Sequence, residues 1–590
     1  MGVAADSRGG FIVKQEIPVD QATTDYFNIL INRNNQAIRE LVDPSLGMPP
    51  PTPPFETHED KVASRANLQK LQDLYFSCMD EDVILRAGRQ PLLEPLQGIF
   101  TFFPPATTTA TTADSKTILS KTLAKLFNQG LAGLIDVAVI VDPTDPLAHS
   151  LQVKEVKLGL PSKEYYKDVQ TVLTYRSIIA QMFHIVLGEE DVALRTLPFT
   201  DADVAHEWNA AAKVVVDLET QLAAIGTELF DQFDPVKSNN PRTIAQLSAL
   251  VPSLDWTLLF AETLIQTVLQ ATTLKTLRLY FAWVVIKDLG PNLGLLYRRP
   301  LQVLNAVIAG TAPELQPPRW KDCVVAINTN LGDMAGYFFI QEFFKGSSRQ
   351  SVVSIIDSLL QTYAQIFTTL PWLDEPTRTG ALQKVQAIQK LIGYSTDSPN
   401  VASPISLLSY YFNLTISKSD HFGNQHRYAV WSKALERSQL NDSVNQKKME
   451  ESPQIVDAFY LGPTNHIIFP AGILQPPFFH VDNPEYLNYG AMGVAAGHEI
   501  THGFDNMGRN YDSAGRVKNW WTDMTEKTFN EKAQCFVDQY GNFTIKGPDG
   551  KDYKVNGQLT LGENIADNGG LEHAYSTWQT RYQSDPLGTM

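Results

Sequence analysis

Residues 498–502, His-Glu-Ile-Thr-His, place two imidazoles and a carboxylate where they could hold and use a metal ion. On a helix, residues four apart lie on one face, so His498 and His502 can direct two ring nitrogens at one cation. Glu499 lies beside them, where a general base has to be. A catalytic zinc site keeps one position open for water, whereas a structural site closes it, usually with a thiolate. The three cysteines are scattered far apart, which excludes a cysteine-based site.

Residues 563–567, Glu-Asn-Ile-Ala-Asp, repeat the spacing of four with carboxylates. Glu563 is the predicted third ligand of a single Zn²⁺ ion. We expect Asp567, one turn further on, to accept a hydrogen bond from His498, and Asp505 to do the same for His502. Asp505 could instead be a plain acid at a helix end, and the His pair could belong to an exposed helix with no metal.

The helix that would position the two histidines has recognisable ends. Asn483 is a candidate N-cap, followed by Pro484 in the first helical position and Glu485 in the first turn. Gly503 offers a C-terminal stop. The helix between them is largely apolar, with Met492, Val494, Ala495, Ala496 and Ile500. Because buried histidines without partners are costly, a metal ion would account for this pair.

A short β signal precedes that helix. Residues 455–460 and 466–469 are apolar or β-branched, and Gly462-Pro463 lies between them as turn residues. The pattern predicts a hairpin whose free edge can accept a peptide as an added strand. An ordinary structural hairpin is the alternative.

The rest of the chain is typical of a large soluble protein that is mostly α-helical. It has 590 residues, 43% hydrophobic content and a net charge of −16, which argues against nucleic-acid binding. No apolar run approaches the roughly 20 residues of a membrane span. Helical periodicity recurs near 164–188, 203–228, 255–288, 350–369 and 378–392. We therefore predict a mostly helical domain at 10–400, a connecting segment at 401–450 and a zinc-binding catalytic domain at 451–590.

Several segments resemble a known family. Residues 494–505 (VAAGHEITHGFD) and 561–570 (LGENIADNGG) resemble the zinc helix and the third-ligand helix of the neprilysin and endothelin-converting-enzyme family. Residues 469–479 match a further signature, and 319–323 with 372–378 resemble its helical domain. The resemblance implies a two-lobed, mainly α protein. Its catalytic lobe would be a thermolysin-like zincin with a small β element, and a large helical lobe would cover the site.

The same resemblance implies a zinc metalloendopeptidase at the cell surface or outside the cell. It would cleave oligopeptides on the amino side of large apolar residues, with Glu499 as general base. Asp457 and Ala458 match the substrate-binding strand of the family, which has Asn in place of Asp457. This substitution removes an amide donor and adds a negative charge. Gly569-Gly570 predicts close helix contact.

The cysteines and the end of the chain follow the family pattern only in part. Cys78 and Cys323 match a disulfide pair, with two buried free thiols as the alternative, and Cys535 is expected to be unpaired. A histidine that stabilises the oxyanion and an arginine that binds the substrate carboxylate have no match, and His573 is expected to point away from the metal. We therefore expect a chain incomplete at both ends. A zinc-binding but catalytically impaired homologue and a metal-free helical interaction protein are the alternatives.

Overall fold

The computed structural model describes residues 23–47, 57–104, 112–155, 157–188, 206–254, 272–313, 317–547 and 550–586, with the single positions 18 and 21. The start of the first predicted domain, residues 10–17, lies outside the described residues. So does the first part, 255–271, of one predicted helical stretch.

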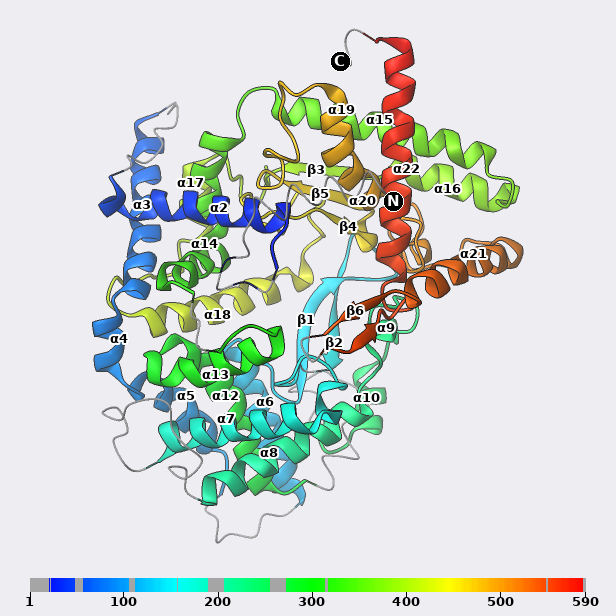
Figure 1. The fold of residues 1–590 in the computed structure, drawn as a ribbon. Coiled ribbons are helices and arrows are strands. Elements are labelled where there is room, and N and C mark those ends of the chain that lie inside the picture. Colours follow the sequence, from blue (N-terminus) through cyan, green and yellow to red (C-terminus); the bar gives the residue numbers. More distant parts are fainter. Residues whose placement is uncertain are drawn as a thin grey trace.

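The helices form two lobes, each around its own hydrophobic core (Figure 1). The lower lobe in this view contains α5 (Gln90–Phe100), α6 (Thr112–Asn128), α7 (Val169–Leu187), α8 (His206–Ile225), α10 (Ile244–Leu250), α12 (Leu274–Leu289) and α13 (Leu295–Ala309). The upper lobe contains α2 (Tyr26–Val42), α3 (His58–Met79), α14 (Arg319–Phe343), α15 (Ser348–Thr369), α16 (Glu375–Ala387), α17 (Pro404–Tyr410), α20 (Val494–His502) and α22 (Leu561–Ser584). The predicted mainly α, two-lobed fold is confirmed.

Between the lobes lies α18 (His421–Ser438), which packs on α3 of one lobe and on α6 and the strand β1 (Ile135–Val141) of the other. The upper core draws on α2 and α3 as well as on the second half of the chain. The predicted domain boundaries at residues 400 and 450 stay a prediction. The upper core contains residues from both sides of these positions, so it does not mark a boundary there.

The upper lobe contains a three-stranded sheet in the order β3-β5-β4. The strands are β3 (Gln389–Gly393), β4 (Phe459–Leu461) and β5 (His466–Pro470), with β4 antiparallel and β3 parallel to β5. The predicted hairpin is confirmed, and β4 is an edge strand of the sheet. It begins at 459 and not at 455, because the preceding backbone packs against Gly472, whose N–H donates to the Pro453 carbonyl.

One sequence prediction in the upper lobe is wrong in its last part. Helical periodicity at 378–392 ends at Ala387, and the chain continues as β3, because pairing with β5 overrides the local pattern. The helical first half also contains an antiparallel hairpin of β1 (Ile135–Val141) and β2 (His149–Glu155). A third small hairpin joins β6 (Thr544–Lys546) and β7 (Asp552–Lys554).

The segment before the histidine pair is helical in three parts. A short α19 (Glu485–Asn488) runs through a π-turn at Tyr489–Gly493 into α20. Pro484 occupies the cap position predicted for Asn483, whose amide instead bonds the side chain of Asn488. The helix ends at Gly503, as predicted. None of the helices in the described part of the chain is long and apolar enough to cross a membrane.

The predicted disulfide is confirmed. Cys78 of α3 and Cys323 of α14 are bonded, which closes a loop across 245 residues, and Cys535 is free and exposed. The bond joins two helices that pack closely in the upper core. It therefore reduces the conformational freedom of the unfolded chain without requiring a large rearrangement of the folded protein.

Removing this disulfide should destabilise the protein. Replacing Cys78 and Cys323 together by Ala is expected to lower the free energy of unfolding by about 2–5 kcal/mol, because the unfolded chain regains the freedom of a long loop. Denaturant unfolding of the non-reduced protein measures the change. Cys535→Ala is the matched control and should leave the midpoint unchanged.

Candidate metal centre

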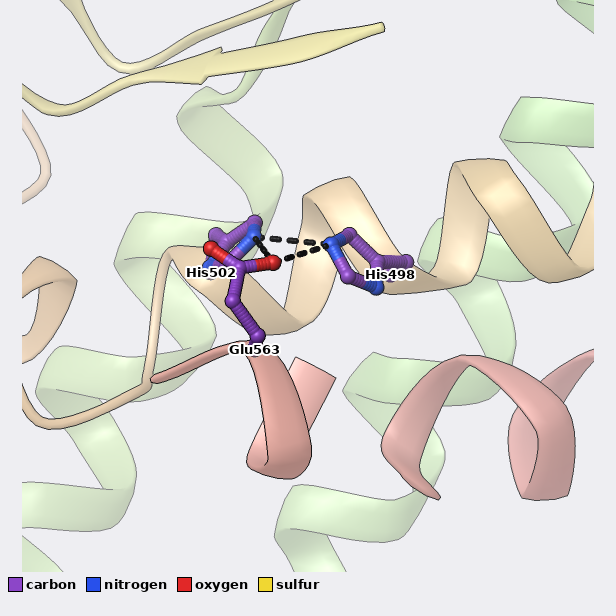
Figure 2. Close-up of side chains that lie close together, drawn as sticks. All are labelled: His498, His502 and Glu563. Carbon is purple, nitrogen blue, oxygen red and sulfur yellow. Dashed lines mark hydrogen bonds and ion pairs between the residues drawn. The ribbon is translucent and has the colours of Figure 1, made fainter. Parts of the chain in front are cut away.

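Three side chains from two helices converge on one point (Figure 2). His498 and His502 come from α20, and Glu563 comes from the first turn of α22. Their ligand atoms all lie within 4.8 Å of one another. The two Nε2 atoms are 2.9 Å apart, and Glu563 Oε2 lies 3.3 Å from that of His498 and 3.6 Å from that of His502. The structure thus brings together residues that are up to 65 positions apart in the sequence.

The outer ring nitrogens each face a carboxylate. Nδ1 of His498 lies 2.9 Å from Asp567 Oδ1, and Nδ1 of His502 lies 2.7 Å from Asp505 Oδ2. A carboxylate accepts, so each Nδ1–H donates and the Nε2 lone pairs point toward each other. Two lone pairs at 2.9 Å need a proton or a cation between them. Two imidazoles and a carboxylate are a common ligand set of catalytic zinc, so these residues fit that ion.

The charges around these residues also favour a cation. Burial lowers the pKa of His498, but hydrogen bonds to Asp567 and Glu563 outweigh it and raise that pKa to about 9. For His502, the partners Asp505 and Glu563 likewise overcome burial and raise the pKa to about 10. Hydrogen bonds from both histidines hold the pKa of Glu563 well below its usual range. The site therefore holds positive charge strongly, and a metal ion must displace protons to enter.

Glu499 is the buried member of the group, only 6% exposed. Burial raises its pKa to about 7, although His502 and His498 act in the opposite direction. A carboxyl group with a pKa near neutral can both take up and release a proton at physiological pH.

The two helices approach so closely because glycines line their contact. A Cβ on Gly497 would lie 2.9 Å from the Cα of Gly570, and a Cβ on Gly570 would lie 2.7 Å from the backbone nitrogen of His498. A Cβ on Gly569 would lie 2.6 Å from Thr501 Oγ1. The close contact predicted for Gly569-Gly570 is confirmed, and it sets the distance between the histidines and Glu563.

We expect Gly570→Ala to disturb this spacing. The new methyl group has to push α22 away from α20, because the nearest atoms are backbone and cannot rotate aside. Overpacking of this kind typically costs about 1–3 kcal/mol, and the affinity for zinc should fall with it. Thermal unfolding and zinc titration measure both effects. Gly541→Ala, where the added Cβ would meet no other part of the fold within 4 Å, should change neither.

Tyr363 of α15 was not singled out in the sequence. Its hydroxyl lies 2.7 Å from the carbonyl oxygen of Gly497 and 2.6 Å from Thr501 Oγ1, so it bonds α20 just before His498 and just before His502. The ring of His573 packs against Tyr363, with centroids 4.4 Å apart. His573 therefore faces α15, as expected for a residue that points away from the metal.

Asp457 and Ala458 directly precede the edge strand β4, which packs against α20. The exposed Asp457 carboxylate accepts a hydrogen bond from the Ala458 N–H at 2.9 Å. Burial of part of this group raises the pKa of Asp457, and the nearby charge of Glu563 adds to the effect. The predicted substrate residues thus lie within electrostatic range of the three converging side chains.

Comparison with known proteins gives consistent matches. Two family models, both described as peptidase family M13, match residues 8–395 and 457–587. The chain is 29% identical to neprilysin of Oryctolagus cuniculus over 605 residues, covering 97% of this chain and 77% of that protein. It is 28% identical to human endothelin-converting enzyme 1 over 600 residues, covering 97% and 72%.

Solved structures agree in fold. A crystal structure of the Mycobacterium tuberculosis zinc metalloprotease ZMP1, in complex with an inhibitor, superposes with a TM-score of 0.80 at 28% identity. That match covers 98% of this chain and 84% of the other. PEPO of Lactobacillus rhamnosis superposes with a TM-score of 0.78 at 20% identity, which supports the fold alone. The small sheets and paired helices of the upper lobe fit the predicted thermolysin-like zincin.

Proposed function

Since the chain belongs to peptidase family M13, whose members are zinc-dependent metalloendopeptidases, we propose that one zinc ion is held by His498, His502 and Glu563 and that this site hydrolyses oligopeptides. The observation that carries the proposal is the convergence of Glu563 on the histidine pair, with both outer ring nitrogens already bonded to carboxylates.

When bound, zinc polarises the peptide carbonyl and lowers the pKa of water in its open position. Glu499 accepts the proton of the attacking water and delivers it to the leaving amine. Asp567 and Asp505 keep both histidines in the tautomer that presents Nε2 to the ion.

The edge strand β4 is the proposed peptide-binding element. Its outer side can pair with an extended substrate, because β4 is bonded to β5 alone among the strands of the described residues. Ala458 would contribute its carbonyl oxygen, while Asp457 would add negative charge beside the bound peptide. We propose that apolar side chains are preferred after the scissile bond, as the resemblance implies.

The charge of Asp457 should affect which peptides are cleaved. We expect the parent to prefer a substrate with Lys near the scissile bond over a matched one with Glu. Asp457→Asn should reduce that ratio of kcat/KM by about two- to fivefold, the range for a partly exposed charge pair. Asp73→Asn, on α3, should leave the ratio unchanged. An unaltered ratio in Asp457→Asn would contradict the proposed role.

A zinc-binding but catalytically impaired homologue is the second candidate. The packing of His573 on Tyr363 favours it, because this histidine is not directed at the site as a donor to an oxyanion. Bound zinc without turnover would identify it.

A quenched peptide with a central Phe or Leu tests the proposed function. We expect hydrolysis by the purified chain, loss of hydrolysis after chelation, and recovery on adding one equivalent of zinc.

The disulfide supports a further proposal, that the protein works at the cell surface or outside the cell, where oxidising conditions preserve such bonds.

A further inference from the structure

Lys384 of α16 is completely buried beside the loop that follows α20. Its ammonium donates hydrogen bonds to the carbonyl oxygens of Gly508 and Tyr511, both at 2.7 Å. The rings of Tyr460 and Phe504 lie 5.6 Å away, close enough for cation–π attraction. Because an unpaired ammonium is costly to bury, these contacts hold Lys384 in one position.

The same loop contains the carboxylate that bonds His502. Asp505 Oδ1 accepts from the backbone N–H groups of Met507 and Gly508, both at 2.7 Å, while its Oδ2 accepts from His502. Gly508 therefore connects the two charged groups: its N–H bonds Asp505 and its carbonyl bonds Lys384. A continuous series of hydrogen-bonded residues leads from Lys384 through this loop to the ring of His502.

Packing leaves the loop little freedom to compensate. A Cβ on Gly508 would lie 1.7 Å from the carbonyl oxygen of His502, so the turn is pressed directly against the end of α20. Asp505 is only 4% exposed, so solvent screens its charge poorly. Burial lowers the pKa of Lys384 to about 7, and the neighbouring charges of Asp505 and Asp512 oppose that change.

We propose that Lys384 is a positioning residue of the metal centre, which fixes the loop 505–511 so that Asp505 holds His502 with its Nε2 directed at Glu563 and His498. The inference rests on the proposed zinc site and adds a residue that touches neither metal ligand nor substrate. Lys384 acts on zinc affinity through Asp505, and its effect should vanish when Asp505 can no longer hold the histidine.

Zinc affinity of the metal-free protein tests this directly, by competition with a chelator of known affinity. The variants are Lys384→Met, which keeps the length of the side chain without its charge, Asp505→Asn, and the two combined. We expect each single variant to bind zinc about 10- to 100-fold more weakly, the usual range for residues that support a ligand. The double variant should bind about as weakly as Asp505→Asn alone, because both changes break one series of bonds.

The controls separate this role from a general loss of stability. Lys345→Met, an exposed lysine paired with Glu342, should leave zinc affinity unchanged. If Lys384→Met does not fold, Lys384→Gln replaces it, and thermal unfolding of each metal-free variant is recorded alongside.

Parent-like zinc affinity in a folded Lys384 variant, or multiplying losses in the double variant, would overturn the inference. A parent that binds no zinc would instead refute the proposed metal site.

Discussion

Glu499→Gln is expected to abolish nearly all peptide hydrolysis while leaving zinc bound. The amide has almost the same shape as the carboxylate but cannot accept a proton from water. General base catalysis is typically worth about 10²–10⁴-fold, so kcat/KM should fall by that factor. Steady-state hydrolysis of a quenched peptide and zinc content, measured on the same preparation, provide the test. Glu531→Gln, an exposed change on α21 (Asp523–Gly541), should have the activity of the parent.

The pH dependence of the parent follows from the same residue. Glu499 works as a base only when ionised, so kcat/KM should fall as the pH falls through its pKa. Burial raises that pKa to about 7 in the metal-free protein, and a bound cation lowers it. We therefore expect the acidic limb of the profile at or below about pH 7. Turnover by Glu499→Gln equal to that of the parent would show that another group takes the proton.

Glu563→Ala should remove stoichiometric zinc binding. Glu563 is the single carboxylate among the three converging ligand atoms, and without it two histidines would have to hold the ion alone. Parent protein should gain about 2.7 kcal/mol of stability when free zinc is 100 times the dissociation constant. The variant should gain little at the same concentration. Thermal unfolding with and without added zinc measures this difference.

Asp567→Asn is the matched comparison for that experiment. Asp567 lies one turn further along α22 than Glu563. It bonds His498 but is not one of the three proposed zinc ligands. We expect it to weaken zinc binding by only about 10- to 100-fold, so saturating zinc should still stabilise this variant. Equal stabilisation of Glu563→Ala and the parent would contradict the assigned ligand set.

The local geometry of the centre could be predicted from spacing. Two histidines four apart share a helix face whatever surrounds them, and the same holds for Glu563 and Asp567. Gly569-Gly570 indicated close packing, and the structure shows that α22 meets α20 at this pair. To predict that Glu563 approaches the histidines, the resemblance to a family was also needed, because no local rule brings two separate helices together.

Other features had no usable signal in the sequence. Lys384 lies in a largely polar helix, where a lysine is normally solvated, and only the tertiary fold buries it. Tyr363 is one of two aromatic residues in α15, and nothing in the sequence marks its bonds to α20. The β1–β2 hairpin is different: β-branched residues in Ile135–Val141 were a readable signal that the helical periodicity of the surrounding region obscured.

Anomalous X-ray diffraction at the zinc absorption edge, on crystals of the zinc-loaded protein, tests the central claim most directly. We predict one strong peak per chain, bounded by Nε2 of His498, Nε2 of His502 and a carboxylate oxygen of Glu563. A peak located among other residues, or no peak in protein loaded with excess zinc, would contradict the account.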